Sequence, residues 1–278
     1  MGVSVPALPW ATVASPEESD IIFYTVPDDE GSDFDATADG PDAVLATLRS
    51  INAEYDDDDH LTYRASPSSG ISRHAIYDSG DTEFKDLFQS AWTWGKSKKW
   101  ILGVGGDHSI TAHVVTGLSN AYDAEIAMVV FDAHADLGES EERDYGSWLR
   151  QVTAGAVDPR NVKLVGTRVG KPAHIEEAKD MGFQTMDVYD GVVIDKPTYV
   201  SIDMDVFDPS YAPGVTDPHP FGLEPRDVLR SVKRILSGGN VIGMDIVEVA
   251  PSLDPTERTA HLAGWLAVEA MSALRDFE

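Results

Sequence analysis

Acidic and histidine side chains follow four apolar runs of this sequence, each at the point where the run ends. The four segments are Gly105-Gly106-Asp107-His108-Ser109 after residues 100–104, Asp132-Ala133-His134-Ala135-Asp136 after 126–131, Asp203-Met204-Asp205 after 199–202, and Val247-Glu248 after 241–246. Side chains alternate along an extended chain, so the acids and the histidine of each Asp-x-His-x-Asp or Asp-x-Asp segment point to one face. Carboxylates and imidazoles are common metal ligands. The four segments are therefore candidate parts of a single metal site.

Each segment taken alone has a simpler explanation. The glycine-rich turn is no dinucleotide loop, because His108 stands where the last glycine should be, and it is no phosphate loop, because it lacks the Gly-Lys-Ser/Thr ending. A single His108 would more often be a packed or surface histidine than a ligand. The Asp-x-His-x-Asp run could be the flank of a loop. Asp203 and Asp205 could cap the turn at Asp208-Pro209. Glu248 in an apolar strand could belong to a buried ion pair.

The simple explanations fail if four of these carboxylates lie close together. Two carboxylates 4 Å apart repel each other by roughly 4 kcal/mol at an effective dielectric constant of 20, and four carboxylates form six such pairs. That sum exceeds roughly 5–15 kcal/mol, the whole stability of a typical domain. Four Asp charges balance two divalent cations, and oxygen ligands with imidazole suit Mn²⁺, with Co²⁺, Fe²⁺, Ni²⁺ and Zn²⁺ as competitors. Two such ions would acidify a bridging water, and the acidic pocket would select a cationic substrate.

The elements that must position these residues alternate along the chain. Apolar runs at 21–26, 75–77, 100–104, 126–131, 162–165, 199–202 and 241–246 predict strands, and the segments 41–52, 83–96, 110–120, 172–181, 225–236 and 259–277 predict helices. Alternating strands and helices predict an α/β fold with a mostly parallel sheet covered on both faces. Ligands of such sheets bind beyond the carboxyl ends of the strands. Residues 1–19 are expected to be an extended N-terminal segment, and residues 20–278 a single domain.

The composition narrows the possible partners. The chain of 278 residues has 48 Asp and Glu against 21 Lys and Arg, a formal net charge of −27. This charge argues against nucleic-acid and membrane-surface binding, and no apolar run approaches the 18 residues of a membrane span. The absence of cysteine excludes disulfides and thiolate chemistry. With no secretory signal in the sequence, we expect a cytoplasmic, halophilic protein from a salt-accumulating organism.

The four segments together resemble the ureohydrolase family of arginases, agmatinases and formimidoylglutamases. The resemblance rests on Gly-Gly-Asp-His-Ser at 105–109, Phe-Asp-Ala-His-Ala-Asp at 131–136, Ser-Ile-Asp-Met-Asp-Val-Phe-Asp-Pro-Ser-Tyr-Ala-Pro-Gly at 201–214 and Gly-Met-Asp-Ile-Val-Glu-Val-Ala-Pro at 243–251. It covers residues 20–276, and the third block is similar to agmatinase-like members. With the acidic composition it indicates a haloarchaeal member. The resemblance implies a three-layer α/β/α sandwich with a sheet of about eight strands, and a homotrimer or homohexamer.

The resemblance also implies a role for each residue at the strand ends. His108, Asp132, Asp136 and Asp203 would bind one Mn²⁺, and Asp132, His134, Asp203 and Asp205 the other. Asp136 would also pass a proton to the leaving amine. Glu248 would hold the substrate guanidinium, because a carboxylate matches a planar guanidinium through two parallel hydrogen bonds.

Two segments depart from the family pattern. Tyr145 stands where many members have a histidine, and residues 217–221 read Asp-Pro-His-Pro-Phe where agmatinase-like members have glycine and threonine. Both segments are expected to face the substrate, with Tyr145 contacting it.

The expected function is Mn²⁺-dependent hydrolysis of a linear guanidino compound, first of all agmatine to putrescine and urea, or a larger substrate carrying the agmatine group. Arginase or formimidoylglutamase activity is the alternative, and would need Arg143 or Arg168 to bind a substrate carboxylate. An inactive metal-binding homologue that regulates or assembles with a partner is the alternative of another class.

Overall fold

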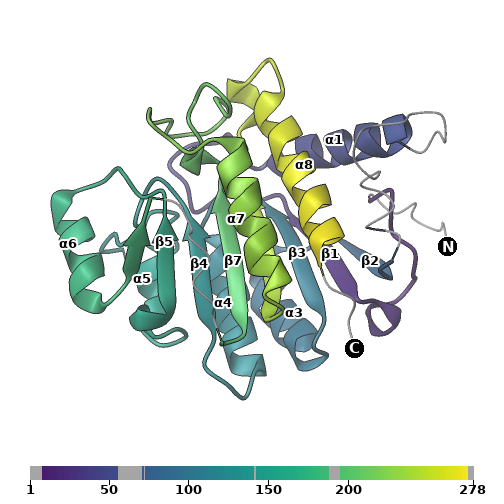
Figure 1. The fold of residues 1–278 in the computed structure, drawn as a ribbon, viewed down its shortest axis with the longest axis horizontal. Helices are drawn as coiled ribbons and strands as arrows, with labels where there is room; N and C mark the ends of the chain where they lie inside the picture. Colours follow the sequence, from purple (N-terminus) through teal and green to yellow (C-terminus); the bar gives the residue numbers. More distant parts are fainter. Residues whose placement is uncertain (1–7, 56–70, 72, 141, 188–194, 275–278) are drawn as a thin grey trace.

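A parallel sheet runs through the centre of the molecule (Figure 1). The computed structural model describes residues 8–55, 71, 73–140, 142–187 and 195–274. Its strands are β1 (Ile21–Val26), β2 (Ile76–Asp81), β3 (Trp100–Gly105), β4 (Ala127–Phe131), β5 (Val162–Val165), β6 (Gln184–Met186), β7 (Thr198–Asp203) and β8 (Val241–Val247). The eight strands lie in the order β2-β1-β3-β8-β7-β4-β5-β6, and every neighbouring pair is parallel. The predicted sheet of about eight mostly parallel strands is confirmed.

Helices cover both faces of this sheet. They are α1 (Gly40–Tyr55), α3 (Phe84–Lys96), α4 (Ile110–Ala121), α5 (Trp148–Thr153), α6 (Pro172–Met181), α7 (Pro225–Ser237) and α8 (Arg258–Ala273). The side chains of α1, α7 and α8 belong to one apolar core, and those of α3, α4, α5 and α6 to a second. Figure 1 shows α7 and α8 on the near face of the strands and α3 and α4 on the far face. The predicted three-layer α/β/α sandwich is confirmed.

The burial of the strands explains their apolar sequence. In β3, Trp100, Leu102 and Val104 enter the first core and Ile101 the second, so successive side chains must all be apolar. Short 3₁₀ turns join some elements: η1 (Pro16–Glu18), η2 (Pro159–Asn161), η3 (Met204–Val206) and η4 (Pro251–Leu253).

The structure adds elements that the sequence did not predict. The strand β6 at the edge of the sheet has two exposed residues out of three, so it carries no apolar run. Helix α5 is only six residues long. Helix α8 ends at Ala273, four residues before the predicted end, and residues 275–277 of that prediction lie outside the described residues.

The described part of the N-terminal segment packs against the first edge of the sheet. Leu8 is buried, and its backbone N–H donates to Oδ2 of Asp78 at 2.8 Å. The N–H groups of Thr12 and Val13 donate to the carbonyl of Ile76 in β2, at 2.9 and 3.2 Å. Residues 1–7 of the predicted segment lie outside the described residues. The division of the chain at residue 20 stays a prediction.

The order of the strands decides which loops meet. The strands β3, β8, β7 and β4 are neighbours, and these are the four strands that end in the acidic and histidine segments. Because all are parallel, their carboxyl ends lie at one edge of the sheet. Among the described residues, no helix has both the length and the apolar content that a membrane crossing requires.

Candidate metal centre

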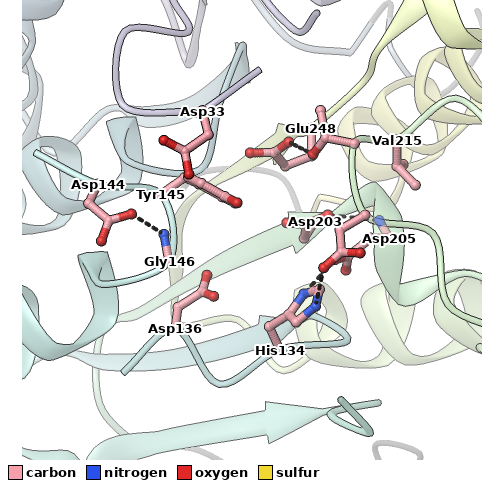
Figure 2. Close-up of a pocket in the computed structure, with 12 residues that line it drawn as sticks. Asp33, His134, Asp136, Asp144, Tyr145, Gly146, Asp203, Asp205, Val215 and Glu248 are labelled. Atoms are coloured by element: carbon pink, nitrogen blue, oxygen red, sulfur yellow. Dashed lines mark hydrogen bonds and ion pairs between the residues drawn. The ribbon is translucent and has the colours of Figure 1, made fainter. Parts of the chain in front are cut away.

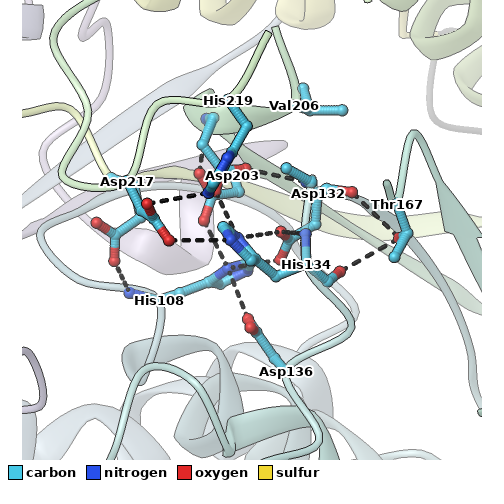
Figure 3. Close-up of polar contacts among 12 residues, drawn as sticks. His108, Asp132, His134, Asp136, Thr167, Asp203, Val206, Asp217 and His219 are labelled. Atoms are coloured by element: carbon cyan, nitrogen blue, oxygen red, sulfur yellow. Dashed lines mark hydrogen bonds and ion pairs between the residues drawn. The ribbon is translucent and has the colours of Figure 1, made fainter. Parts of the chain in front are cut away.

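Two groups of ligand atoms meet at the carboxyl ends of these strands (Figure 3). In the first group, Nδ1 of His108 lies 3.1 Å from Oδ2 of Asp203, 3.3 Å from Oδ2 of Asp132 and 3.5 Å from Oδ2 of Asp136. The four residues come from the ends of β3, β4 and β7. All four were predicted to bind one ion, and the structure brings them together.

The second group shares Asp132 with the first. Nδ1 of His134 lies 2.8 Å from Oδ2 of Asp205 and 3.6 Å from Oδ1 of Asp132. Asp203 also serves as a cap, because its Oδ1 accepts the N–H of Asp205 at 2.7 Å at the start of η3. Asp203 therefore caps η3 and not the turn at Asp208-Pro209, where Oδ1 of Asp208 itself accepts the N–H of Ser210 at 3.0 Å. The other oxygen of Asp203 faces His108.

The donor atoms fit divalent cations. Oδ2 of Asp132 is buried and accepts no hydrogen bond in the described structure, although it lies 3.3 Å from Nδ1 of His108. Burial raises the pKa of Asp136 and Asp203 well above the usual range, and repulsion from the neighbouring carboxylates raises it further. Burial alone would lower the pKa of His108, but Asp132 and Asp203 raise it instead. Without cations, the cluster must therefore hold protons, and metal ions would replace these protons.

A buried acid supports His108 from behind. Nε2 of His108 lies 2.8 Å from Oγ of Ser201, which donates to Oδ1 of Asp245 at 2.6 Å. Asp245 in β8 is fully buried and also accepts hydrogen bonds from Thr111 and Tyr199. Such contacts fix the orientation of a metal-binding imidazole. Asp245 was not among the site residues predicted from the sequence, although an acid inside an apolar strand indicates a functional or paired carboxylate.

Asp136 and Glu248 both occupy an unusual backbone conformation. Their φ angles are 46° and 66°, in the left-handed region that residues other than glycine rarely adopt. The buried Trp148, which the sequence analysis also missed, donates its indole N–H to Oδ2 of Asp136 at 2.6 Å. Strain of this kind concentrates at functional sites, where the surrounding contacts hold it.

Glu248 lies beside the metal-ligand groups. Its Oε1 accepts the backbone N–H of His108 at 2.9 Å, and its Oε2 accepts the hydroxyl of Thr216 at 3.1 Å. Only 3% of Glu248 is exposed, and this burial, followed by the charge of Asp107, raises its pKa to about 8. A guanidinium beside this carboxylate would restore its ionised form.

An acidic pocket opens onto the candidate metal ligands (Figure 2). It has a volume of about 220 Å³ and is lined by Asp33, His134, Asp136, Asp144, Tyr145, Gly146, Asp203, Asp205, Val215, Thr216, Asp217 and Glu248. Seven of these described residues are acids, and none of them is Lys or Arg. Tyr145 is half-buried, and its N–H donates to the carbonyl of Gly31 at 3.0 Å, so two loops are joined at the pocket. The arrangement favours a cationic ligand.

The two arginines proposed as carboxylate anchors have other contacts. Arg143 donates to Oγ of Ser109 at 2.8 Å, pairs with Asp28 and lies over the ring of Phe84. Arg168 donates to the backbone carbonyl of Asp205 at 2.9 Å and to further carbonyls nearby. Neither lines the pocket. The expectation that one of them anchors a substrate carboxylate has no support in the structure.

Comparisons with known proteins agree with the site. The model of the arginase family matches residues 19–273. The agmatinase of Bacillus subtilis (strain 168) is 34% identical over 185 residues, 62% of this chain and 63% of that protein. The agmatinase of Chromobacterium violaceum is 30% identical over 226 residues, 73% of this chain and 69% of that protein. The crystal structure of a hypothetical agmatinase from Burkholderia thailandensis superposes with a TM-score of 0.80 at 25% identity, over 93% of this chain and 87% of the other. The chain belongs to the arginase family.

Proposed function

We propose that this protein is a binuclear-metal ureohydrolase that hydrolyses agmatine to urea and putrescine. The observation that carries the proposal is a pocket lined by seven acids that ends at two groups of side chains able to hold metal ions. A doubly cationic guanidino amine complements such a pocket along its whole length. Arginine and formimidoylglutamate carry carboxylates, which the pocket would repel.

The two groups of side chains support the metal ligands that the family resemblance implies. His108, Asp132, Asp136 and Asp203 would hold one ion, and Asp132, His134, Asp203 and Asp205 the other. Mn²⁺ suits these ligands best, and Co²⁺, Fe²⁺, Ni²⁺ or Zn²⁺ could replace it. When bound, the ions would supply Lewis acidity and acidify the water that attacks the guanidinium carbon.

The chain's own residues would bind the substrate and move a proton. Glu248 accepts the guanidinium N–H groups, and Thr216 holds this carboxylate in place through its hydroxyl. Asp136, oriented by the indole N–H of Trp148, takes a proton from the attacking water and gives it to the leaving amine. Tyr145 lines the pocket and shapes the space for the substrate.

We also propose a cellular setting and an oligomeric state for this protein. The net charge of −27 supports a halophilic, cytoplasmic protein. A homotrimer or homohexamer is what the family resemblance implies, and light scattering at high salt measures the subunit number directly.

Urea release from a panel of substrates tests the proposed function. The protein, loaded with Mn²⁺ in 2 M KCl, is given agmatine, an agmatine extended by an aminoalkyl group, arginine and formimidoylglutamate, with formamide measured for the last. We expect the highest kcat/KM with agmatine or its extended form. A preference for arginine or formimidoylglutamate would refute the substrate assignment. No turnover by a fully loaded protein would favour the inactive homologue.

A further inference from the structure

A pair of residues outside the predicted ligand set touches the second group. Oδ2 of Asp217 lies 3.2 Å from Nε2 of His134, and Oδ1 of Asp217 lies 3.0 Å from Nε2 of His219 (Figure 3). The two imidazole rings lie edge to face, with centroids 5.5 Å apart. One carboxylate therefore lies between two histidines, and Asp217 and His134 both line the pocket.

The two nitrogens of His134 face different surroundings. Nδ1 faces the carboxylates of Asp205 and Asp132 and is the candidate ligand atom. Nε2 is buried and makes no hydrogen bond in the described structure, and the same is true of Nε2 of His219. Asp217 is the carboxylate within ion-pair distance of this nitrogen, and 54% of its side chain is exposed, so packing does not prevent its carboxylate from turning into line. A metal-bound imidazole keeps a proton on its second nitrogen and donates it to a carboxylate, a carbonyl or water.

We propose that Asp217 is a positioning residue for His134: it accepts the Nε2–H, fixes the ring for metal binding, and is itself held by His219. This inference rests on the proposed metal centre. Asp217 would support the ring of His134 as Ser201 and Asp245 support the ring of His108.

The loop that carries Asp217 is tied to the metal-binding turn. Arg168 donates to the carbonyl of His219 at 2.8 Å and to that of Asp205 at 2.9 Å, so one guanidinium joins both segments. The N–H of Leu223 donates to the carbonyl of Val206 at 2.9 Å, which closes the loop at its base. These contacts hold the loop that carries Asp217 next to the segment that carries Asp205.

The two residues that would support the histidines differ in burial. Asp245 is fully buried, whereas Asp217 is in contact with solvent. Water competes for an exposed hydrogen bond, so the support of His134 is weaker than that of His108. We therefore expect the ion bound by His134 to be the weaker and more readily exchanged of the two.

A third metal ion held by His134, Asp217 and His219 is the rival explanation, since their ligand atoms lie within 4.8 Å of one another. With Nδ1 already bound to one ion, a second ion on Nε2 would remove the last proton of the ring. A hydrogen bond to Asp217 needs no such deprotonation, and we therefore favour it.

Metal affinity measured without substrate tests the inference. Isothermal titration with Mn²⁺ in 2 M KCl gives the two dissociation constants, and electron paramagnetic resonance reports whether two ions are coupled. In Asp217→Ala we expect the weaker dissociation constant to rise about 10- to 100-fold, while the tighter one stays within about twofold. Asp217→Asn keeps an acceptor oxygen and should restore part of the affinity. His219→Ala should weaken the same site less than Asp217→Ala.

Asp33→Asn is the matched control. Asp33 lines the same pocket and also carries a negative charge, but no contact joins it to His134 in the described structure. If Asp33→Asn weakened Mn²⁺ binding as much as Asp217→Ala, charge at a distance would explain the effect, and the inference would fail. Unchanged affinities in Asp217→Ala would also overturn it. So would a third bound Mn²⁺ in the wild type that Asp217→Ala and His219→Ala both lose.

These measurements do not depend on the substrate. If agmatine is not hydrolysed but the second Mn²⁺ is weakened only by changes at Asp217 and His219, the substrate assignment fails and the inference stands. If the wild type binds no divalent ion, both fail. If agmatine is hydrolysed and Asp217→Ala binds metal normally, the inference alone fails.

Discussion

The backbone N–H of His108 donates to Oε1 of Glu248 at 2.9 Å, and the N–H of Glu248 donates back to the carbonyl of Gly106 at 2.8 Å. The turn that carries a candidate metal ligand and the carboxylate that would hold the substrate are thus fixed to each other. A guanidinium bound by Glu248 would lie at a constant distance from the metal centre. This kind of positioning lowers the barrier of a reaction by holding its partners in place.

Glu248→Gln should reduce kcat/KM strongly while both metal ions stay bound. Removal of one partner of a buried charge pair costs roughly 2–5 kcal/mol, or about 30- to 4,000-fold. Steady-state kinetics with agmatine, together with metal analysis of the same sample, measure both quantities. Thr216→Val is the control, because it removes only the hydroxyl that donates to Oε2, and it should cost about 2- to 10-fold. Full activity of Glu248→Gln would mean that the substrate is not held through a guanidinium.

Asp132→Asn and Asp203→Asn should each abolish activity and reduce the bound metal from two ions to one or none. Each change removes a negative charge beside His108, and Asp132 also faces His134. An amide is a weaker ligand for a divalent ion than a carboxylate. Inductively coupled plasma mass spectrometry after dialysis gives the metal content. Two tightly bound ions in either variant would refute the ligand assignment.

Tyr145→Phe should reduce kcat/KM less than Glu248→Gln does. Burial, followed by the charge of Glu248, raises the pKa of Tyr145 above its usual value, so the phenol keeps its proton at neutral pH and is a poor proton carrier. The loss should appear mainly in KM, with an unchanged pH profile. A variant that is inactive with both metals bound would show instead that Tyr145 transfers a proton.

The metal-free protein should become less stable as the pH rises from 5 to 8. Burial raises the pKa of Glu248 to about 8 from an unfolded value of 4.5, so in this range the folded chain keeps a proton that the unfolded chain releases. The raised pKa values of Asp136 and Asp203 act in the same direction. Melting temperatures in EDTA should therefore fall with pH, and Mn²⁺ should remove most of the fall. Glu248→Gln should show a flatter dependence, and a metal-free wild type equally stable at both pH values would contradict the charge argument.

High salt should stabilise the protein. The net charge of −27 makes surface carboxylates repel one another, and the Debye length shrinks from about 10 Å at 0.1 M to about 3 Å at 1 M salt. We expect the melting temperature to rise between 0.1 and 2 M KCl. NaCl at the same ionic strength serves as the control for a specific effect of potassium. Equal melting temperatures across this range would exclude a halophilic surface.

The sequence revealed the parts of the site that follow strand ends. His108, Asp132, Asp203 and Glu248 could be predicted because each follows a buried apolar run, and parallel strands bring such positions together. The helices on both faces of the sheet were predictable because the apolar runs of the strands are continuous. The edge strand β6 was not, because two of its three residues are exposed and both of these, Gln184 and Thr185, are polar.

Other contacts of the site depend on the conformations of loops. Trp148 reaches Asp136, and Asp217 reaches His134, through loop conformations that leave no periodic signal in the sequence. The partners of Arg143 and Arg168 likewise come from tertiary contacts, namely Asp28 for the first and backbone carbonyls for the second. Residue type and spacing alone could not separate these structural arginines from arginines that bind substrate.

The position of β8 has a consequence for the synthesis of the chain. On a ribosome, the strands β2, β1 and β3 can form one half of the sheet, and β7, β4, β5 and β6 the other, long before residues 241–247 emerge. Until then β3 and β7 each have an unpaired edge, the kind of edge that favours aggregation. His108 belongs to the first half, and the other predicted ligands, Asp132, His134, Asp136, Asp203 and Asp205, belong to the second. The nascent chain therefore cannot assemble the candidate metal centre until its penultimate large element joins the two halves.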